Sequence, residues 1–312
     1  MRWLLIFTAS LLVLCTSLPV EKLSEEEYCS KVWRYDYKCA LNYILNDTEI
    51  QKVSSVAEKL KGEDCRDTAW KILEWEDENL KYDFEKANLP PPQIVVRGRE
   101  VEVYDFGRYI QTPYETIVKR KGICTDYAFL TLALLRYNGC EGYLVNVTFE
   151  KDDVGHVAAA IMVNGTYFIL DQHLPPFDAE GYFVKWMKDG KKIERVEIVN
   201  ENSTLLELAE GYKATKRDAE SLESRLCLYF ESIGIKRDPK LSGDVLPGNY
   251  REGYILKLNL EMAEYYHPEF EKQYSEHIFK ILKGKIEGRY RAFNIDVSVK
   301  NASFEVTLYL AR

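Results

Sequence analysis

The sequence predicts an α+β protein in two parts, and three observations lead to this fold class. Helix caps and helical spacing of apolar residues fill residues 24–82, while residues 143–172 contain three short apolar strands with turn signals. Helices followed by antiparallel strands are typical of α+β folds. The 312 residues suffice for one large domain and a smaller one, and a further set of helices and strands follows residue 210, where we place the boundary.

The composition is that of an ordinary globular protein. Hydrophobic residues make up 46% of the chain and charged residues 29%, which excludes disorder over most of its length. The formal net charge is −8, and the isoelectric point lies near 5.3. Nucleic-acid binders need clustered Lys and Arg to displace counterions, so we expect no nucleic acid as a partner.

An uncharged stretch at the start of the chain predicts export. Residues 3–18, WLLIFTASLLVLCTSL, are shorter than the roughly 20 residues of a spanning helix. Cys15 and Ser17 have the −3 and −1 spacing of a small-residue cleavage site. We interpret residues 1–18 as a signal peptide of a secreted or cell-surface protein. Two alternatives stay open: a short anchor that associates the protein with a membrane, and lipidation of Cys15.

Sequons and cysteines add detail to this interpretation. Five sequons fit an extracytoplasmic glycoprotein, at Asn46, Asn146, Asn164, Asn202 and Asn301. Without the leader, the cysteines form either three disulfides, or two disulfides and two thiols, one of them functional. They show no C-x-x-C spacing and the four histidines are scattered, so we expect no structural metal and no cofactor. The six cysteines are Cys29, Cys39, Cys65, Cys124, Cys140 and Cys227.

Helices and one hairpin are predicted in the first half of the chain. Cap residues, glycine stops and apolar spacing define three helices, and alternation defines a hairpin that turns around Arg97 and Gly98. A fourth helix, from Cys124 to Asn138, is apolar nearly all round, so we expect it to be buried. The three helices cover 46–62, 64–82 and 112–122, and the hairpin covers 94–104.

Strands are predicted next, followed by a second mixed region. Asn164 and Gly165 are the strongest two-residue hairpin signal in the chain and join strands over 156–163 and 166–172. Asp189 and Gly190 predict a second hairpin. Its strands are 183–188 and 192–199, and the later elements are a polar helix over 204–232, a strand over 254–260, a helix over 268–284 and a hairpin of 292–299 with 304–311.

Cys124 stands at the start of the apolar helix, directly after Gly122 and Ile123. The N–H groups and dipole of a helix N-terminus stabilise a thiolate, which makes Cys124 a candidate nucleophile. Two simpler interpretations stay open, a buried small residue and half of a disulfide in a structural domain. A cysteine nucleophile needs a base, and the base needs an orienting group.

The register of the predicted hairpin supplies candidates for both partners. With a two-residue loop, Val163 pairs with Thr166, so His156 lies opposite His173, and Asp171 lies two pairs nearer the turn. Residues opposite one another share a face of the ribbon, and side chains alternate with period two. His156 and Asp171 are then diagonal neighbours with Cα atoms ~7–8 Å apart, within reach of a hydrogen bond.

We interpret Cys124, His156 and Asp171 as a catalytic triad. His173 projects from the same face in this register and is the rival base. Taken singly, His156 is better explained as a solvated residue at a strand end, and Asp171 as a turn former. Their shared face, together with a cysteine at a helix start, favours the triad. Ala158, opposite Asp171, leaves room for the contact.

These residues resemble the transglutaminase-like superfamily of papain-like folds. That superfamily has a G-x-C-x-D-x-A run at the start of a long helix, and here GICTDYA contains Cys124, with His156 32 residues later and Asp171 15 residues beyond it. The segment ILEWEDENLKYD resembles the helix and Tyr-bearing segment before this core. The resemblance covers about 70–200 and implies a papain-like helix bundle packed on an antiparallel sheet, within a domain over 22–210. A smaller C-terminal α+β domain of unknown role, 211–312, lies outside it.

The resemblance also implies a reaction on a protein or peptide substrate. Cys124 would attack an amide carbonyl, His156 would take the thiol proton and pass it to the leaving amine, and Asp171 would fix the imidazole tautomer. Hydrolysis, as by a peptidase or deamidase, is the first expectation, since many microbial members are hydrolases. Cross-linking transfer to a lysine amine and a non-catalytic surface binding module are the alternatives. Ala158 stands where the superfamily often has Trp, and calcium dependence is not expected.

Overall fold

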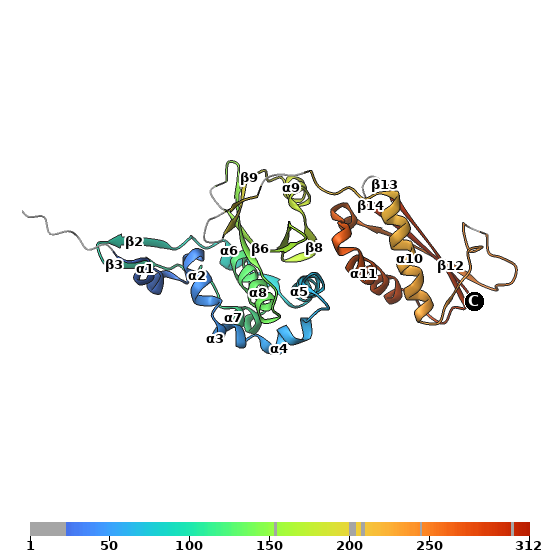
Figure 1. The fold of residues 1–312 in the computed structure, drawn as a ribbon, viewed down its shortest axis with the longest axis horizontal. Coiled ribbons are helices and arrows are strands. Elements are labelled where there is room, and N and C mark those ends of the chain that lie inside the picture. Colours follow the sequence, from blue (N-terminus) through green and yellow to red (C-terminus); the bar gives the residue numbers. More distant parts are fainter. Residues whose placement is uncertain (1–22, 153–154, 200–203, 207–209, 244, 301–302) are drawn as a thin grey trace, which may run out of the picture.

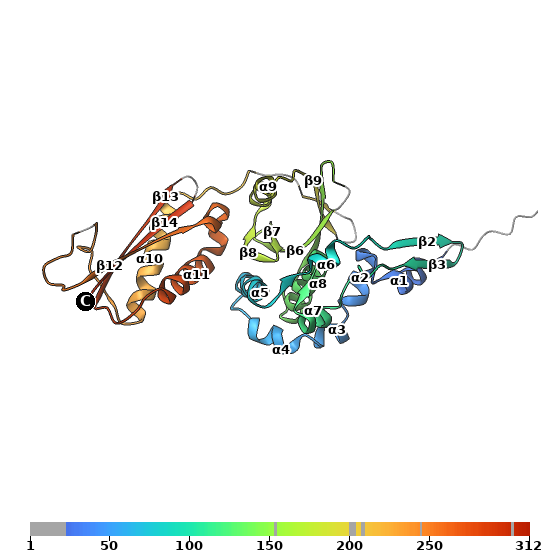
Figure 2. The same cartoon turned by 180° about the vertical axis from the view of Figure 1, so that it is seen from behind.

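A computed structural model describes residues 23–152, 155–199, 204–206, 210–243, 245–300 and 303–312. The expectations for the leader and for Asn202 and Asn301 lie outside these ranges. The molecule is elongated, with a hairpin at one end and the C-terminal sheet at the other (Figures 1 and 2). In the described ranges, no helix is long and apolar enough to cross a membrane.

Short capped helices form the first part of the chain, as predicted for residues 24–82, but the predicted helix over 46–62 is divided into three short pieces. Asp36, Asn46 and Asp64 are N-caps whose side chains accept backbone N–H groups of the first turn. Thr112 and Glu115 form the capping box of the last helix before Cys124. The helices are α1 (Glu25–Val32), α2 (Tyr37–Ile44), α3 (Asp47–Gln51), α4 (Ser54–Ala57), η1 (Glu58–Leu60), α5 (Cys65–Asn79), α6 (Phe84–Ala87) and α7 (Pro113–Lys119).

Two disulfides fasten this helical part. Cys29 is bonded to Cys39, and Cys65 is bonded to Cys140. Cys124 and Cys227 are free and buried. The second of the two predicted cysteine arrangements is therefore the one in the structure, and Cys124 is not half of a disulfide.

Two small pairs of strands accompany the helices. The predicted hairpin consists of β2 (Gln93–Arg97) and β3 (Glu100–Tyr104), and its turn contains Gly98, whose φ is +62°. The turn lies one residue later than expected. Arg97 pairs with Glu100, so Gly98, which adopts the left-handed conformation, is the first residue of the turn. Elsewhere β1 (Lys81–Tyr82) pairs in parallel with β4 (Lys121–Gly122).

A six-stranded antiparallel sheet is built from strands between residues 143 and 205. Asn164 and Gly165 form its tight turn, with φ of +49° and +83°. Val163 pairs with Thr166 as predicted. The spatial order is β10-β9-β5-β6-β7-β8. The strands are β5 (Tyr143–Phe149), β6 (His156–Val163), β7 (Thr166–Asp171), β8 (His173–Phe177), β9 (Ile193–Val199) and β10 (Thr204–Leu205).

The predicted second hairpin is wrong in its first strand. Residues 183–188 belong to the helix α9 (Ala179–Lys188), which Asp178 caps. The reason is the spacing of its inward residues: Ala179, Tyr182 and Trp186 recur at intervals of three and four, which a helix and not a strand places on one face. Gly190 follows this helix with a positive φ, as a helix stop.

Helices cover both faces of the sheet. The buried helix α8 (Cys124–Tyr137) packs on one face against Val157, Ala159 and Ile161 of β6. Ala158 and Ala160 point the other way, into a second apolar cluster with α9. Since side chains alternate along a strand, His156 and Asp171 point to the α9 face.

The C-terminal part is a four-stranded sheet with two helices. Its order is β11-β13-β14-β12, and the predicted hairpin and the neighbouring strand are confirmed. Trp70 of α5 contacts Tyr274 with ring centroids 5.0 Å apart, so the two parts share one apolar core. The polar helix begins at Lys216 and not near 204, where β10 lies. The elements are α10 (Lys216–Ser232), β11 (Lys236–Arg237), β12 (Gly253–Leu260), η2 (Glu261–Tyr265), η3 (Pro268–Phe270), α11 (Glu271–Gly284), β13 (Ala292–Lys300) and β14 (Ser303–Ala311).

Candidate active site

Cys124 is the first residue of α8 and is 8% exposed. Its position is held by Asp126, whose Oδ2 accepts the Ile123 N–H at 2.8 Å and whose Oδ1 accepts the Gln111 N–H at 2.8 Å. The Lys86 ammonium lies 2.6 Å from Asp126 Oδ2, and both side chains are buried. The segment before Cys124 is thus fastened to α6 and to the chain before α7 by one carboxylate.

His156 and Asp171 are in direct contact. His156 Nε2 lies 2.8 Å from Asp171 Oδ1, and both side chains are buried. The β6 and β7 ladder runs from Val163 and Thr166 to Ala159 and Leu170. Its register brings the two residues side by side at the end of the ladder. The predicted diagonal contact is therefore present in the structure, whereas the catalytic roles of these residues stay a prediction.

The imidazole of His156 lies close enough to the Cys124 thiol to shift its pKa. Nε2 is taken by Asp171, which leaves Nδ1 as the ring nitrogen that can exchange a proton with the sulfur. Burial acts to raise the pKa of Cys124, but His156 and the backbone N–H of Val157 hold it below its usual value. Burial acts to lower the pKa of His156, but the charge of Asp171 and the contact with Cys124 raise it to about 10. The site therefore stabilises the thiolate and the imidazolium as a pair, relative to an isolated thiol and an isolated imidazole.

Asp171 is held ionised by its surroundings. Burial acts to raise its pKa, but His156, Lys185 and Tyr182 keep the pKa of this carboxyl below its usual value. The Tyr182 hydroxyl donates to Oδ2 at 3.0 Å, and Lys185 Nζ lies 3.8 Å from the same oxygen. Oδ1 of Asp171 thus contacts His156, and Oδ2 contacts two side chains of α9.

The predicted position of His173 is wrong. Gln172 has a φ of +65°, so the chain turns after Asp171, and His173 begins β8 instead of continuing β7. His173 Nδ1 lies 2.5 Å from Asp77 Oδ1 of α5, on the surface. The structure therefore brings together Cys124, His156 and Asp171 and leaves His173 out.

Comparisons with known proteins identify the family. A UPF0252 protein of Archaeoglobus fulgidus is 73% identical to this chain over 313 residues, which is 100% of both chains. The chain belongs to the UPF0252 family. A UPF0252 protein of Pyrococcus furiosus is 31% identical over 86% of this chain and 83% of its own length.

A family model described as a transglutaminase-like domain matches residues 51–199 of this UPF0252 protein. The predicted resemblance is thereby confirmed, and the match starts earlier than residue 70. Among solved structures, Legionella pneumophila LapG is similar over 59% of this chain and 89% of its own, with 16% identity and a TM-score of 0.34. A likeness at that score carries no weight for the fold or the activity.

Two aromatic residues of the UPF0252 site were not predicted from the sequence. Trp186 of α9 lies edge-on to His156, with ring centroids 4.9 Å apart, on the face where Ala158 leaves space. The signal that would have found it is the helical spacing of α9. Tyr82 of β1 faces the backbone N–H of Cys124, and burial and the sulfur raise the pKa of Tyr82 to about 12. The pairing of β1 with β4, two residues before Cys124, is not visible in the sequence.

Proposed function

We propose that the chain is a cysteine enzyme that hydrolyses amide bonds of proteins or peptides with Cys124, His156 and Asp171. The observation that carries the proposal is the pairing of the free thiol with a histidine that Asp171 holds at 2.8 Å. The transglutaminase-like domain over 51–199 supports the same class of chemistry. Four other cysteines are consumed in disulfides, which leaves Cys124 as the thiol that has a base.

The geometry supports nucleophilic catalysis in two steps. The Cys124 thiolate attacks the amide carbonyl carbon, and the carbonyl oxygen becomes an oxyanion. His156 gives its proton to the amine nitrogen as the C–N bond breaks, which leaves a thioester. Water then attacks the thioester and gives a proton to His156, the C–S bond breaks, and the acid leaves with the thiolate and the imidazolium restored. Asp171 holds the imidazole orientation throughout.

The test is turnover on a glutamine-containing peptide and on an unfolded protein, with and without an added primary alkylamine. We expect ammonia or new amino termini to be released, and the Cys124→Ala variant to release neither. Incorporation of the alkylamine at the expense of hydrolysis would instead assign a cross-linking acyltransferase. Equal, negligible turnover by the parent chain and Cys124→Ala on all substrates would contradict an enzyme and favour a binding module.

We also propose that this enzyme acts outside the cytoplasmic membrane. The proposal rests on the uncharged residues 3–18 with Cys15 and Ser17 at cleavage-site spacing. Amino-terminal sequencing of the natural protein should return a start near Leu18. A start at Met1 with the protein integral to membranes would make this stretch an anchor.

A further inference from the structure

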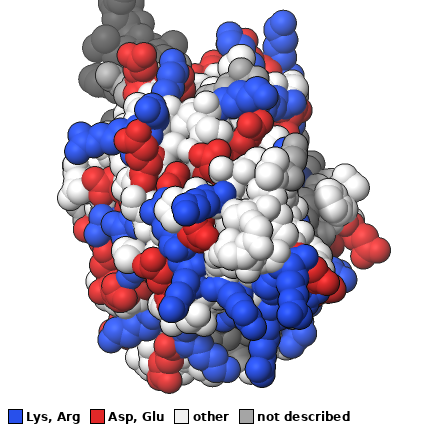
Figure 3. All heavy atoms as spheres, turned by 90° about the vertical axis from the view of Figure 1, so that its right-hand side faces the viewer, with Lys and Arg blue, Asp and Glu red and all other residues white. Residues whose placement is uncertain are grey.

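The C-terminal end of the molecule has a charge opposite to that of the whole chain. We define this end as residues 236–252 and 283–291 with Arg312. It contains nine Lys and Arg and four Asp and Glu, whereas the whole chain has 42 and 50. Figure 3 views the molecule from this side, and Lys and Arg gather there beside an uncharged patch. The excess of positive charge is therefore local.

Most of these bases are available to a ligand. Within the described part of the chain, seven of these Lys and Arg side chains are exposed and form no ion pair. Contacts hold the two segments together, since the Lys236 N–H donates to the Arg291 carbonyl at 3.1 Å. Just after the first segment, the ring of Tyr254 has its centroid 5.5 Å from that of Tyr290. The seven bases are Lys236, Lys240, Arg251, Lys283, Lys285, Arg289 and Arg291.

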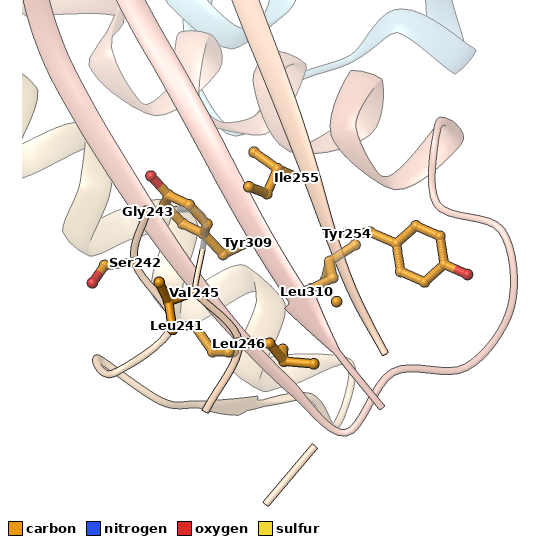
Figure 4. Close-up of a pocket in the computed structure, with 10 residues that line it drawn as sticks. Leu241, Ser242, Gly243, Val245, Leu246, Tyr254, Ile255, Tyr309 and Leu310 are labelled. Atoms are coloured by element: carbon orange, nitrogen blue, oxygen red, sulfur yellow. The ribbon is translucent and has the colours of Figure 1, made fainter. Parts of the chain in front are cut away.

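Exposed apolar side chains lie among the bases. Val245 is 81% exposed, and Tyr254 and Ile255 are 42% and 41% exposed. They line a hollow of about 120 Å³ between the loop before β12 and the strand itself, with Leu246 and Leu310 (Figure 4). Exposed apolar groups in a cluster mark an interaction surface more often than scattered ones do.

A second hollow, with basic walls, adjoins the apolar one. It has a volume of about 420 Å³, and its lining includes Lys285 and Arg312 beside one acidic residue, Glu287. Arg312 is paired with Glu252, so Lys285 is the basic side chain of this lining without an ion pair among the described residues. Tyr254 and Leu310 line both hollows and thus separate an apolar site from a basic one. An anionic head group beside an apolar chain has the matching arrangement.

We propose that this end docks on an anionic membrane surface. Surfaces that lie in the membrane interface combine Lys and Arg with bulky apolar residues, as here. Phosphates attract each base that reaches them, while the acyl region accepts Val245 and Ile255. A nucleic acid would offer phosphates and no apolar region for these two aliphatic residues. In a second copy of the chain, the acidic residues outside this end could pair with the Lys and Arg side chains. The experiment below distinguishes a nucleic acid and a second copy from a membrane.

The test uses vesicles of phosphatidylglycerol and of phosphatidylcholine with the chain that lacks residues 1–18, because the apolar leader would enter any bilayer. All described elements stay in this chain, and its circular dichroism and melting temperature are first matched to those of the full chain. We expect co-sedimentation with phosphatidylglycerol vesicles that weakens with salt, and little with phosphatidylcholine.

Three variants identify the surface. The first variant combines Lys240→Glu, Lys285→Glu and Arg289→Glu. It should weaken binding roughly 100-fold, because three positive charges no longer attract the anionic head groups. Val245→Ser should weaken binding several-fold with the same salt dependence. The matched control reverses three exposed lysines elsewhere, with the same change in net charge, and should keep binding within about threefold: Lys38→Glu, Lys59→Glu and Lys61→Glu.

Four results would overturn the proposal. They are the absence of binding to phosphatidylglycerol vesicles, full binding by the end variant, an equal loss in the control variant, and a preference for another partner. A preference for a nucleic acid is measured by binding to a single-stranded oligonucleotide. Self-association is measured by sedimentation velocity of the chain alone, and its loss in the variant with Lys240→Glu, Lys285→Glu and Arg289→Glu would assign the surface to a second copy.

Discussion

Two His–Asp pairs in this chain have similar chemistry and opposite surroundings. His156 and Asp171 are joined at 2.8 Å, and their side chains are 11% and 3% exposed. His173 and Asp77 are joined at 2.5 Å, and their side chains are 62% and 55% exposed. The first pair contacts the Cys124 thiol, whereas no described contact joins the second pair to a thiol.

The difference shows that burial and a neighbouring nucleophile distinguish a catalytic pair from an ion pair. An exposed pair is screened by water and contributes at most about 1 kcal/mol to stability. In the buried pair, water does not compete, so the charge of Asp171 raises the pKa of His156 to about 10 and the histidine in turn stabilises the thiolate. A histidine beside an aspartate is therefore weak support for a site unless its environment is known.

The largest expected effect separates the two histidines. His156→Ala removes the group that carries the proton, so turnover should fall roughly 10⁴-fold or more. The matched change His173→Ala should leave turnover within about threefold, because the exposed pair does not contact the reacting atoms. Turnover on a peptide amide measures both, with circular dichroism to confirm folding. Loss in His173→Ala with an active His156→Ala would reverse the assignment of the base.

The second prediction compares the two carboxylates. Asp171→Asn should reduce kcat about 10²–10⁴-fold, because an amide can accept from or donate to the imidazole and permits the wrong tautomer. Asp77→Asn, at the exposed pair, is expected to change kcat less than about twofold. Steady-state kinetics of both variants at equal pH give the comparison. An Asp171→Asn enzyme with full kcat would show that the carboxylate does not orient the histidine.

The third prediction concerns the contacts of Asp171 alone. Tyr182→Phe removes the hydroxyl that donates to Oδ2 at 3.0 Å, so kcat should fall about 3- to 10-fold with KM unchanged. Its control is Tyr212→Phe, which removes a similar hydroxyl from Asp218 at 2.9 Å, away from the triad, and should leave kcat unchanged. A rise in KM without a fall in kcat would place Tyr182 in substrate binding.

Local signals in the sequence predicted most of this fold and the three site residues. The tight turn at Asn164 and Gly165 sets the register, and the register brings His156 to Asp171. Gly122 and the apolar helix after it predicted Cys124 at a helix start. These inferences succeeded because a two-residue turn and a helix start each determine the direction of nearby side chains without reference to distant residues.

Contacts between distant segments account for what the sequence did not predict. The left-handed Gln172 ends β7 and turns His173 toward Asp77, 96 residues earlier in the chain. Trp186 reaches His156 because α9 covers that face of the sheet, whereas the alternation of residues 183–188 predicts a strand. A segment of six residues can fit the period of a strand and the period of a helix, so tertiary packing decides which of the two forms.

Alkylation of the native protein by a small haloacetamide at graded pH tests the central claim most directly. The chain holds an internal control, because burial raises the pKa of the other free thiol, Cys227, to about 11. The account predicts that Cys124 reacts rapidly at pH 6, since its pKa is held below the usual value. It also predicts that the thiolate keeps its imidazolium partner until His156 loses its proton near pH 10. Peptide mapping should place the label on Cys124 and not on Cys227. Negligible reaction of Cys124 below pH 8, or the first label on Cys227, would contradict the account.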